Sequence, residues 1–205
     1  MLFCWFSLFF VLIHNVDIIS SAAGNLHMID GTSIHDVIGG DIFFEIVDPE
    51  ELEYTYRLRP AKDFGGSFNS NKFKVQHGIL VPTIPRDACT KIRNYGDIRG
   101  NIALIERGEC SFLAKTLNVE KFGAIAAIIT DTNPDSTESE HYIEMIHDNS
   151  SSDANIPAGY LLGKNGQMIL STLRKLKQGY AIVNVPVNLT FTPPQLINHP
   201  PWLGW

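Results

Sequence analysis

Residues 96–131 read GDIRGNIALIERGECSFLAKTLNVEKFGAIAAIITD, and this stretch decides the fold. The apolar run at 102–105 predicts a short buried strand. Ser111 suits the N-cap of a helix that runs to about Phe122, and Gly123 suits its C-terminal end. The apolar run at 125–130 predicts a second buried strand. A strand, a helix and a strand in this order predict a βαβ unit, with two parallel strands joined by a right-handed crossover.

Regions on both sides of this unit carry further strands and one more helix. Apolar and polar residues alternate from Leu52 to Leu58, which is typical of a strand with one buried face. A helix is expected at 166–178, where Ile169, Leu173 and Leu176 have helical spacing. The alternation at 183–189 predicts another strand, and Pro186 predicts that this strand lies at a sheet edge. Shorter strands are expected at 41–47, 73–75, 79–81 and 156–162.

The composition is that of a chain that buries a core. The 205 residues are 44% hydrophobic and 19% charged, so the chain is not of the disordered class. A formal net charge of -6 argues against nucleic acid as a partner, because phosphate binding needs clustered Lys and Arg. We find no internal repeat and no second set of core elements, so we expect one domain.

The first residues read as a targeting signal. Residues 1–13 are almost entirely apolar but too short to span a bilayer, and small residues follow at 20–24. This pattern predicts a secretory signal peptide that is cleaved after Ala23, and therefore a secreted, extracellular protein. The alternative is an uncleaved anchor, which His14 and Asp17 disfavour. Beyond the leader, no stretch is long and apolar enough to cross a membrane.

These observations divide the chain into four parts. We expect a signal peptide at 1–23, an N-terminal extension at 24–50, a single domain at 51–191 and a Pro/Trp-rich tail at 192–205. The tail ends in PPWLGW, which could act as a recognition peptide in polyproline conformation. We favour the alternative that the tail folds back and covers an apolar patch with its tryptophans, because exposed tryptophans would be adhesive.

Removal of the leader leaves two cysteines, Cys89 and Cys110. In a secreted chain an even pair predicts a disulfide. The bridge would close a loop of about 20 residues and stabilise the fold by about 3 kcal/mol in the chain-entropy model. The functional alternative makes Cys110 a catalytic nucleophile, which requires a reduced thiolate and a neighbouring base.

Two Asn-x-Ser/Thr sequons predict N-glycosylation, at Asn149 in a polar loop and at Asn188 on the polar face of the last strand. Sequons also arise by chance, so the alternative is two unmodified surface asparagines. Both positions are expected to be accessible, and the predicted leader would take the chain through the secretory pathway. We therefore expect a glycoprotein.

A search for catalytic motifs finds no complete one. The nucleophile elbow G-x-S-x-G, the phosphate-binding loop and the dinucleotide fingerprint are all absent from the sequence. Asp131 and Thr132 follow an apolar strand, but Asn133 comes next instead of glycine, so Asp131 is read as a turn residue. These observations predict a protein that is not an enzyme and that uses no cofactor.

One cluster in the polar loop 131–155 supports an alternative function. His141, Glu144 and His147 are spaced three apart and could make a metal-dependent regulator or hydrolase. The zinc-protease pattern H-E-x-x-H is missing, so a surface cluster without metal is the favoured reading. A weak calcium or zinc site would draw on further acidic residues of the same loop, namely Asp135, Glu138 and Asp148.

The central stretch resembles the protease-associated (PA) domain family. The resemblance rests on Gly100 before the first apolar strand, on the spaced motif Arg107-Gly108-x-Cys110-x-Phe112-x-x-Lys115, and on Gly123-Ala124 before Ile128-Ile129. It continues through Ile156-Pro157-Ala158 and the glycine that opens the next helix, Gly166. Several spaced features thus agree over about 70 residues.

The resemblance implies a mixed α/β fold, an open β-barrel or sandwich with a βαβ unit and two flanking helices. In the family such domains are thought to bind peptides or modulate substrate access without chemistry of their own. For this chain it implies a secreted, N-glycosylated, non-catalytic protein with an extracellular protein or peptide partner. We expect the recognition surface near the long loop 131–155, because loops on a rigid scaffold carry binding.

Overall fold

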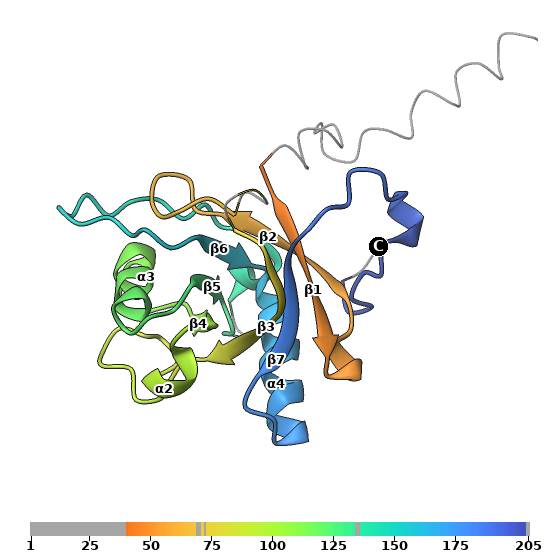
Figure 1. Ribbon diagram of the computed structural model, residues 1–205, viewed down its shortest axis with the longest axis horizontal. Coiled ribbons are helices and arrows are strands. Elements are labelled where there is room, and N and C mark those ends of the chain that lie inside the picture. The colour runs from red at the N-terminus through yellow and green to blue at the C-terminus, as the bar shows by residue number, and fades with distance from the viewer. Residues whose placement is uncertain (1–39, 69–70, 72, 134–135, 204–205) are drawn as a thin grey trace, which may run out of the picture. The chain divides into compact units, whose positions relative to one another are not determined.

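The computed structural model describes residues 40–68, 71, 73–133 and 136–203. The predicted signal peptide and residues 24–39 of the extension therefore lie outside the described residues. The described chain forms one compact unit. Seven strands follow one another around a closed barrel in the order β1-β2-β6-β5-β4-β3-β7 (Figure 1). The fold class is mixed α/β as expected, and the barrel is closed where the sequence suggested an open one.

The βαβ unit is present as predicted. Strand β4 (Ile102–Glu106) leads into helix α3 (Phe112–Lys121), which leads into strand β5 (Ala126–Thr130). The two strands are parallel neighbours, with Ile102 opposite Ala126 and Glu106 opposite Thr130. Ser111 caps α3 by accepting a hydrogen bond from the Ala114 N–H at 3.0 Å. The helix ends before Gly123, whose φ of +89° suits glycine.

The remaining strands complete the barrel. Strand β6 (Ala158–Leu161) continues the parallel run beside β5, and β3 (Val75–Pro82) lies parallel to β4 on its other side. Strands β1 (Ile42–Asp48), β2 (Thr55–Pro60) and β7 (Ala181–Val187) pair antiparallel with their neighbours. Two short strands were expected at 73–75 and 79–81, and β3 replaces them.

Two apolar layers explain why the first four residues of β4 and of β5 are all apolar. Ile102, Leu104, Ala126 and Ile128 face the barrel interior, while the residues between them face outward. The interior is closed by α4 (Gly163–Leu176), whose Ile169, Leu170 and Leu173 are buried. The outward layer packs against α3 and α2 (Tyr95–Ile98). Strands that are covered on both faces lose the alternating pattern.

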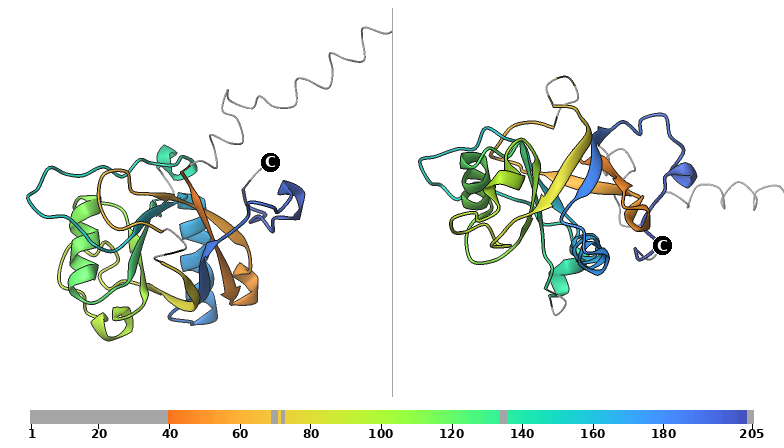
Figure 2. Two further views of the ribbon diagram at one scale, coloured as in Figure 1. Left: turned by 45° about the horizontal axis from the view of Figure 1, so that its top comes forward. Right: turned by 60° about the horizontal axis from the view of Figure 1, so that its bottom comes forward.

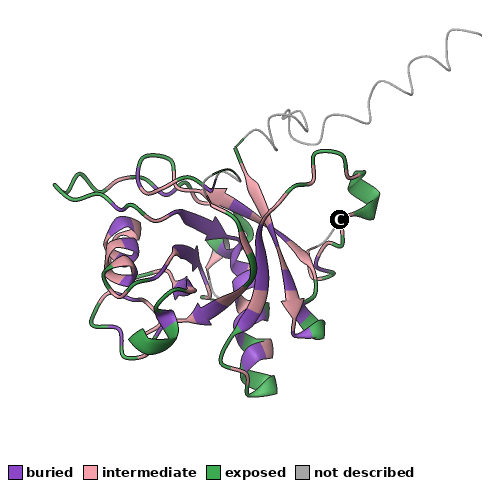
Figure 3. Cartoon of the chain, viewed as in Figure 1, coloured by how far each residue is buried: buried purple, intermediate pink, exposed green. Residues whose placement is uncertain are grey.

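The two longer helices lie on different sides of the strands (Figures 1 and 2). Buried residues concentrate on the strands between them, and the segment around η3 (Pro194–Leu196) is exposed (Figure 3). Two further single-turn helices occur, η1 (Glu50–Leu52) before β2 and η2 (Thr137–Glu140) in the long loop. Residues 142–146 of the same loop are in neither helix nor strand.

Two expectations from the sequence are corrected by the barrel. The domain was expected to begin at residue 51, but β1 lies within the proposed extension and pairs with both β2 and β7, so the compact unit begins at Gly40. Strand β7 was expected at an edge, yet it is paired on both sides. Pro186 is accommodated because the registers of β7 with β1 and β3 both shift near it, and such irregularities tolerate a missing N–H.

Helix α4 also begins earlier than the sequence indicated. It starts at Gly163 instead of Gly166, because Gly163 and Gly166 let the helix approach the end of β5 closely. A Cβ atom on Gly166 would lie 2.0 Å from the Thr130 Oγ1. The helix ends at Leu176, two residues before the predicted end at 178, and its C-cap Lys177 has a left-handed conformation with φ of 57°.

Candidate functional site

A groove of about 600 Å³ opens beside the chain that leaves β2. It lies where the first residues of β1, the end of β2 and the long loop 131–155 come together. We call it the 60–68 groove. Its lining residues are Gly40, Ile42, Pro60, Ala61, Lys62, Asp63, Phe64, Gly65, Gly66, Ser67, Phe68 and Asp153.

Two buried aromatic side chains hold the wall of the groove. Phe64 packs into the outward apolar layer beside α3, and Phe68 packs into the barrel interior. Between them Gly65 and Gly66 lie against the backbone that precedes β6. A Cβ atom on Gly66 would lie 2.4 Å from the Asn155 carbonyl oxygen, so only glycine permits this approach.

Backbone hydrogen bonds tie the same wall to β6 and to the long loop. The Ala61 N–H donates to the Ala158 carbonyl at 2.9 Å, and the Lys62 N–H donates to the Met145 carbonyl at 3.1 Å. The Gly66 N–H donates to the Ile156 carbonyl at 3.0 Å. Gly66 and Pro157 thereby form an isolated parallel β-bridge. These hydrogen bonds fix residues 61–66 as one wall of the groove.

The rim of the groove carries charged side chains of both signs. Lys62 pairs with Glu144 at 3.5 Å, and both side chains are more than 60% exposed, so this pair adds little stability. Asp63 is exposed beside it. The Asp153 carboxylate accepts hydrogen bonds from the N–H groups of Gly65 and Ala154. The carboxylates of Asp63 and Asp153 make this side of the groove acidic. The apolar side chains of Phe64 and Phe68 lie deeper in the wall.

A cation–aromatic stack fixes the long loop to the barrel next to the groove. The ring of Tyr142 lies under the guanidinium groups of Arg57 and Arg59, at 4.8 Å and 5.0 Å from the ring centre. Asp41 forms ion pairs with both arginines, and its side chain is only 6% exposed. Burial raises the pKa of Tyr142 to about 12, so its phenol stays neutral. The loop is thus held on a rigid support.

The start of the long loop is also fixed. Asp131 accepts a hydrogen bond from the Asn133 N–H at 3.0 Å and another from the Ser136 hydroxyl, which makes it the turn residue that the sequence suggested. Arg107 forms ion pairs with Asp131 and with Glu138 on η2. Arg107 belongs to the motif that resembles the PA family, and here it ties the end of β4 to the loop.

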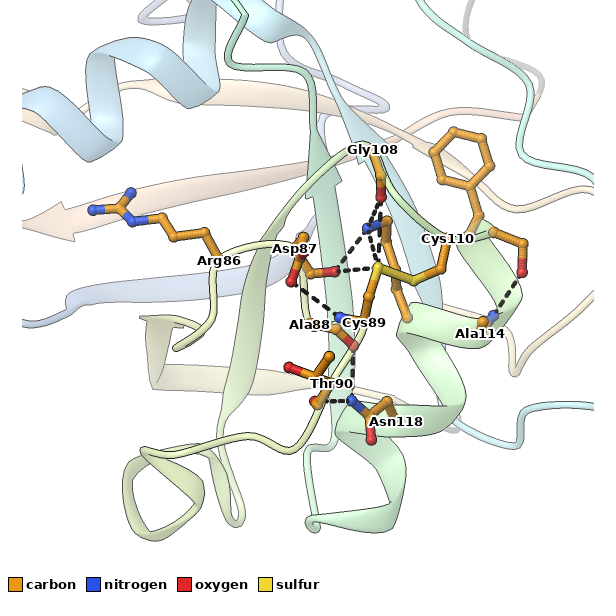
Figure 4. The surroundings of a disulfide bond; sticks show 12 residues. Arg86, Asp87, Ala88, Cys89, Thr90, Gly108, Cys110, Ala114 and Asn118 are labelled. Atoms are coloured by element: carbon orange, nitrogen blue, oxygen red, sulfur yellow. Dashed lines mark hydrogen bonds between the residues drawn. A yellow bond between two sulfur atoms is a disulfide. The ribbon is translucent and has the colours of Figure 1, made fainter.

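The predicted pair Cys89 and Cys110 is present as a disulfide (Figure 4). It joins the segment before α2 to the residue that precedes the cap of α3, and both cysteines are half-buried. Asn118 supports the same junction by donating to the carbonyl groups of Ala88 and Thr90, at 2.7 Å and 2.6 Å. As a disulfide, Cys110 cannot act as the catalytic nucleophile considered as an alternative.

The two sequon asparagines are both exposed. Asn149 lies in the long loop with a left-handed φ of 62°, and its N–H donates to the Nδ1 of His147 at 2.9 Å. Asn188 follows the last residue of β7 instead of lying within the strand. Its Oδ1 accepts hydrogen bonds from the N–H and the hydroxyl of Thr190, so the sequon itself forms a turn.

The candidate metal cluster is not assembled. Glu144 pairs with Lys62, and the imidazole of His147 contacts the Ser152 carbonyl at 3.2 Å. Glu138 pairs with Arg107, and Asp148 accepts a hydrogen bond from the Ser111 hydroxyl; Asp135 lies outside the described residues. Within residues 40–203, apart from the gaps, no three His, Cys, Asp or Glu side chains form a group that could hold a metal ion.

The tail folds back on the barrel, as favoured from the sequence. The Trp202 indole N–H donates to the Asn165 Oδ1 at 2.9 Å, and its ring packs edge-on against Tyr54. The Thr55 N–H donates to the Asn198 carbonyl at 2.8 Å. Trp205 lies outside the described residues. The tail thus belongs to the compact unit and leaves the 60–68 groove uncovered by its described part.

The sequence placed the recognition surface at the long loop 131–155, and the groove borders this loop at Asp153. The sequence did not indicate Lys62 or Asp63, since nothing local links residue 63 with residue 153. The available signal was the Gly65-Gly66 pair between two phenylalanines, which indicates close backbone approach. A Gly65-Gly66 pair is equally typical of a turn. Only the position of the backbone before β6 shows that the two glycines serve close backbone approach.

Among the described residues no helix has the length and apolar character needed to span a bilayer.

Comparison with known proteins shows which family the chain resembles. The PA domain family model matches residues 75–169. The PRADC1-like protein of Drosophila melanogaster is 65% identical over 170 residues, which cover 83% of this chain and 85% of that protein.

Larger proteins share part of the chain. An ER degradation-enhancing alpha-mannosidase-like protein 3 of Xenopus laevis is 37% identical over 103 residues, which are 49% of this chain and only 11% of that protein. A zinc aminopeptidase structure from Bacillus subtilis is 17% identical with a TM-score of 0.47, covering 72% of this chain and 30% of that one.

The family match covers β3 to the first half of α4, which includes the complete βαβ unit and the Arg107–Lys115 motif. The fly relative extends the similarity over most of both chains, so it includes strands outside the family match. The chain therefore belongs to the PA-domain family and is related to the fly PRADC1-like protein and to the PA domains of larger proteins.

Proposed function

We propose that this chain is a secreted, N-glycosylated, non-catalytic module that binds an extended protein or peptide segment in the 60–68 groove. The groove itself carries the proposal: it is open, held by buried anchors on both sides, and combines apolar side chains with backbone groups. Recognition sites usually have this composition, with an apolar surface and a few fixed polar groups.

Charge complementarity narrows the class of partner. Asp63 and Asp153 line the groove, while the cationic Lys62 is paired with Glu144. A segment with a Lys or Arg beside an apolar residue would match this surface, because its cation would face the carboxylates and its apolar side chain the wall. Such complementarity increases specificity and the rate of association more than it increases affinity.

A displayed random-peptide library selected on the purified protein tests the binding site. We expect enriched peptides that contain Lys or Arg next to apolar residues. Asp63→Lys should weaken their binding by tenfold or more, since it reverses an exposed charge in the groove. Asp97→Lys is the matched control, because it makes the same charge change on α2, which contributes no residue to the groove. Equal binding by the wild type and Asp63→Lys would contradict the assignment.

Secretion and glycosylation are supported by the leader-like residues 1–23, the disulfide and the exposure of both sequons. Expression in a secreting eukaryotic cell, followed by intact mass before and after glycosidase, tests them together. We expect cleavage after Ala23 and a loss of glycan mass in Asn149→Gln, in Asn188→Gln or in both. A protein retained in the cell with its leader would contradict this part of the proposal.

A further inference from the structure

A buried lysine lies directly against the disulfide. The Lys115 side chain is fully buried, and its Nζ is 3.2 Å from the Sγ of Cys89. The other two contacts of the Nζ are backbone carbonyls, of Asp87 at 2.7 Å and of Gly108 at 2.5 Å. An ammonium has three donors, so this set uses all of them. None of the ion pairs among the described residues includes Lys115.

An ammonium is a costly group to bury beside a neutral disulfide. Burial lowers the pKa of Lys115, and the carboxylates of Asp87, Glu109 and Glu106 act in the opposite direction and favour its charged form. A disulfide sulfur carries no net charge and is a weak acceptor. A Cys89 thiolate, in contrast, would give the ammonium a counter-ion in direct contact. Once the bridge is open, the contact with Lys115 therefore favours the ionised Cys89 over its protonated form.

The other cysteine, Cys110, lies next to an exposed turn. Cys110 follows Gly108 and Glu109, which are both exposed, and precedes Ser111, the cap of α3. Attack on a disulfide is faster when the leaving thiol has a low pKa. If a nucleophile attacks the sulfur of Cys110, the leaving group is Cys89, which Lys115 contacts.

We propose that Cys89–Cys110 is an exchange-competent disulfide that reacts with dithiols, with Lys115 as the group that positions and stabilises the Cys89 thiolate. A thiolate of the dithiol attacks the Sγ of Cys110, the bond between the two sulfurs breaks, and Cys89 leaves as a thiolate beside Lys115. The second thiol then displaces Cys110, which takes up a proton. Two electrons pass from the dithiol to the protein, and the dithiol becomes a disulfide.

Opening of the bridge leaves the local structure supported by other contacts. Asn118 holds the Ala88 and Thr90 carbonyls, and Asn94 bonds to Ile84 and to Pro82. The segment from Pro82 to Asn94 therefore keeps its place against α3 and β3 when the bridge is open. The reduced protein is expected to hold a half-buried Cys89 thiolate against Lys115 in a folded chain. This inference is independent of the groove.

Single-thiol variants of the full chain, made with Cys4→Ser, test the central point. Cys110→Ser leaves Cys89, and Cys89→Ser leaves Cys110, so both lose the same bridge. The rate of alkylation by iodoacetamide is measured against pH. We expect Cys89 to titrate about one to two pH units below the ordinary thiol value of about 8.5, and below Cys110. A Cys89 that titrates at or above the ordinary value, or no lower than Cys110, overturns the proposal.

A second experiment measures opening of the native bridge by dithiothreitol at neutral pH. Lys115→Met keeps the length of the side chain and removes its charge, and we expect exchange to slow by about threefold or more, since a leaving thiol with a higher pKa leaves more slowly. Lys121→Met, at an exposed position of the same helix, is the control and should exchange like the wild type. Unchanged exchange in folded Lys115→Met overturns the proposal; if Lys115→Met does not fold, the single-thiol titrations decide.

Discussion

Single residues determine how the tail and the loops attach to the barrel. Trp202 is half-buried and makes one hydrogen bond with Asn165 and one edge-on contact with Tyr54. Asn165 is fully buried in the first turn of α4, so its amide oxygen is held in place for the indole. The aromatic side chain of Phe191, fourteen residues from the chain end, is instead 94% exposed. Near the end of the chain, therefore, Trp202 has a structural role and the exposed Phe191 does not.

The first prediction concerns these two aromatic residues. Trp202→Ala should lower the free energy of unfolding by about 2 kcal/mol, less than for a fully buried tryptophan, because it removes a half-buried ring and its hydrogen bond. Phe191→Ala should change it by less than about 0.5 kcal/mol. Urea denaturation of the purified proteins measures both. Equal values for the two variants would show that the tail does not dock.

The second prediction concerns Asp148, which links the long loop to the start of α3. Hydrogen bonds from the Ser111 hydroxyl, and then from Ser150, lower the pKa of Asp148 from 3.8 to about 2. A carboxyl with a lower pKa in the folded state stabilises that state above about pH 4, and this contribution is lost as the pH falls through 4 toward 2.

Ser111→Ala should therefore raise the pKa of Asp148 toward its ordinary value, and Ser111→Thr should keep it low because the hydroxyl remains. An NMR titration of the Asp148 carboxyl carbon measures the pKa in each variant. A pKa that stays at about 2 in Ser111→Ala would show that the Ser111 hydroxyl is not its cause.

At the scale of elements, close packing at the ends of β5 and β6 decides where the helix that follows can begin. Gly163 and Gly166 bring the first turns of α4 against Asp131, Ser139 and Thr130. This contact places Ile169, Leu170 and Leu173 over the barrel interior. The apolar spacing of α4 was readable from the sequence, but its start was not, because the start depends on the approach to β5.

The third prediction tests that approach. Gly166→Ala places a methyl group within 2.0 Å of the Thr130 Oγ1, so the helix or the strand must shift. We expect a loss of about 1–3 kcal/mol of folding free energy, the usual cost of overpacking. Gly179→Ala, where a Cβ atom would meet nothing within 4 Å, is the control and should be nearly neutral. Denaturant midpoints compare the two, and a Gly166→Ala protein as stable as the control would argue against the close contact.

At the scale of the whole molecule, β1 closes the barrel. It pairs with β2, the next strand in the chain, and with β7, which lies more than 130 residues away. Phe44 and Ile46 from β1 are fully buried in the barrel interior. The family match spans only residues 75–169, so the part of the chain that is most recognisable as a PA domain leaves out three of the seven strands, β1, β2 and β7.

The fourth prediction follows from this closure. A chain that comprises residues 40–205 should unfold in one cooperative transition, while a chain that begins at residue 51 should be unfolded or aggregate. The shorter chain lacks β1, so β2 and β7 would each expose an unpaired edge and the interior would lose two large side chains. Circular dichroism during thermal denaturation distinguishes the two. A stable chain that begins at residue 51 would restore the domain boundary expected from the sequence.

The sequence by itself determined the local structure of the central βαβ unit and the pairing of its cysteines. The βαβ arrangement, the Ser111 cap and the pairing of the two remaining cysteines were all readable, because each depends on periodicity or residue type within a short segment. The spaced motif from Arg107 to Lys115 also identified the family. The turn role of Asp131 was readable for the same reason, since a side chain next to its own backbone needs no distant partner.

Only the tertiary structure decided what depends on residues that are distant in the chain. Closure of the barrel by β1 and β7, the two-sided pairing around Pro186 and the groove between residue 63 and residue 153 all bring together segments with no local signal in common. The contact between Lys115 and the sulfur of Cys89 is of the same kind. Long-range pairing is set by the sum of packing over the whole core, so it cannot be read from the pattern of any one segment.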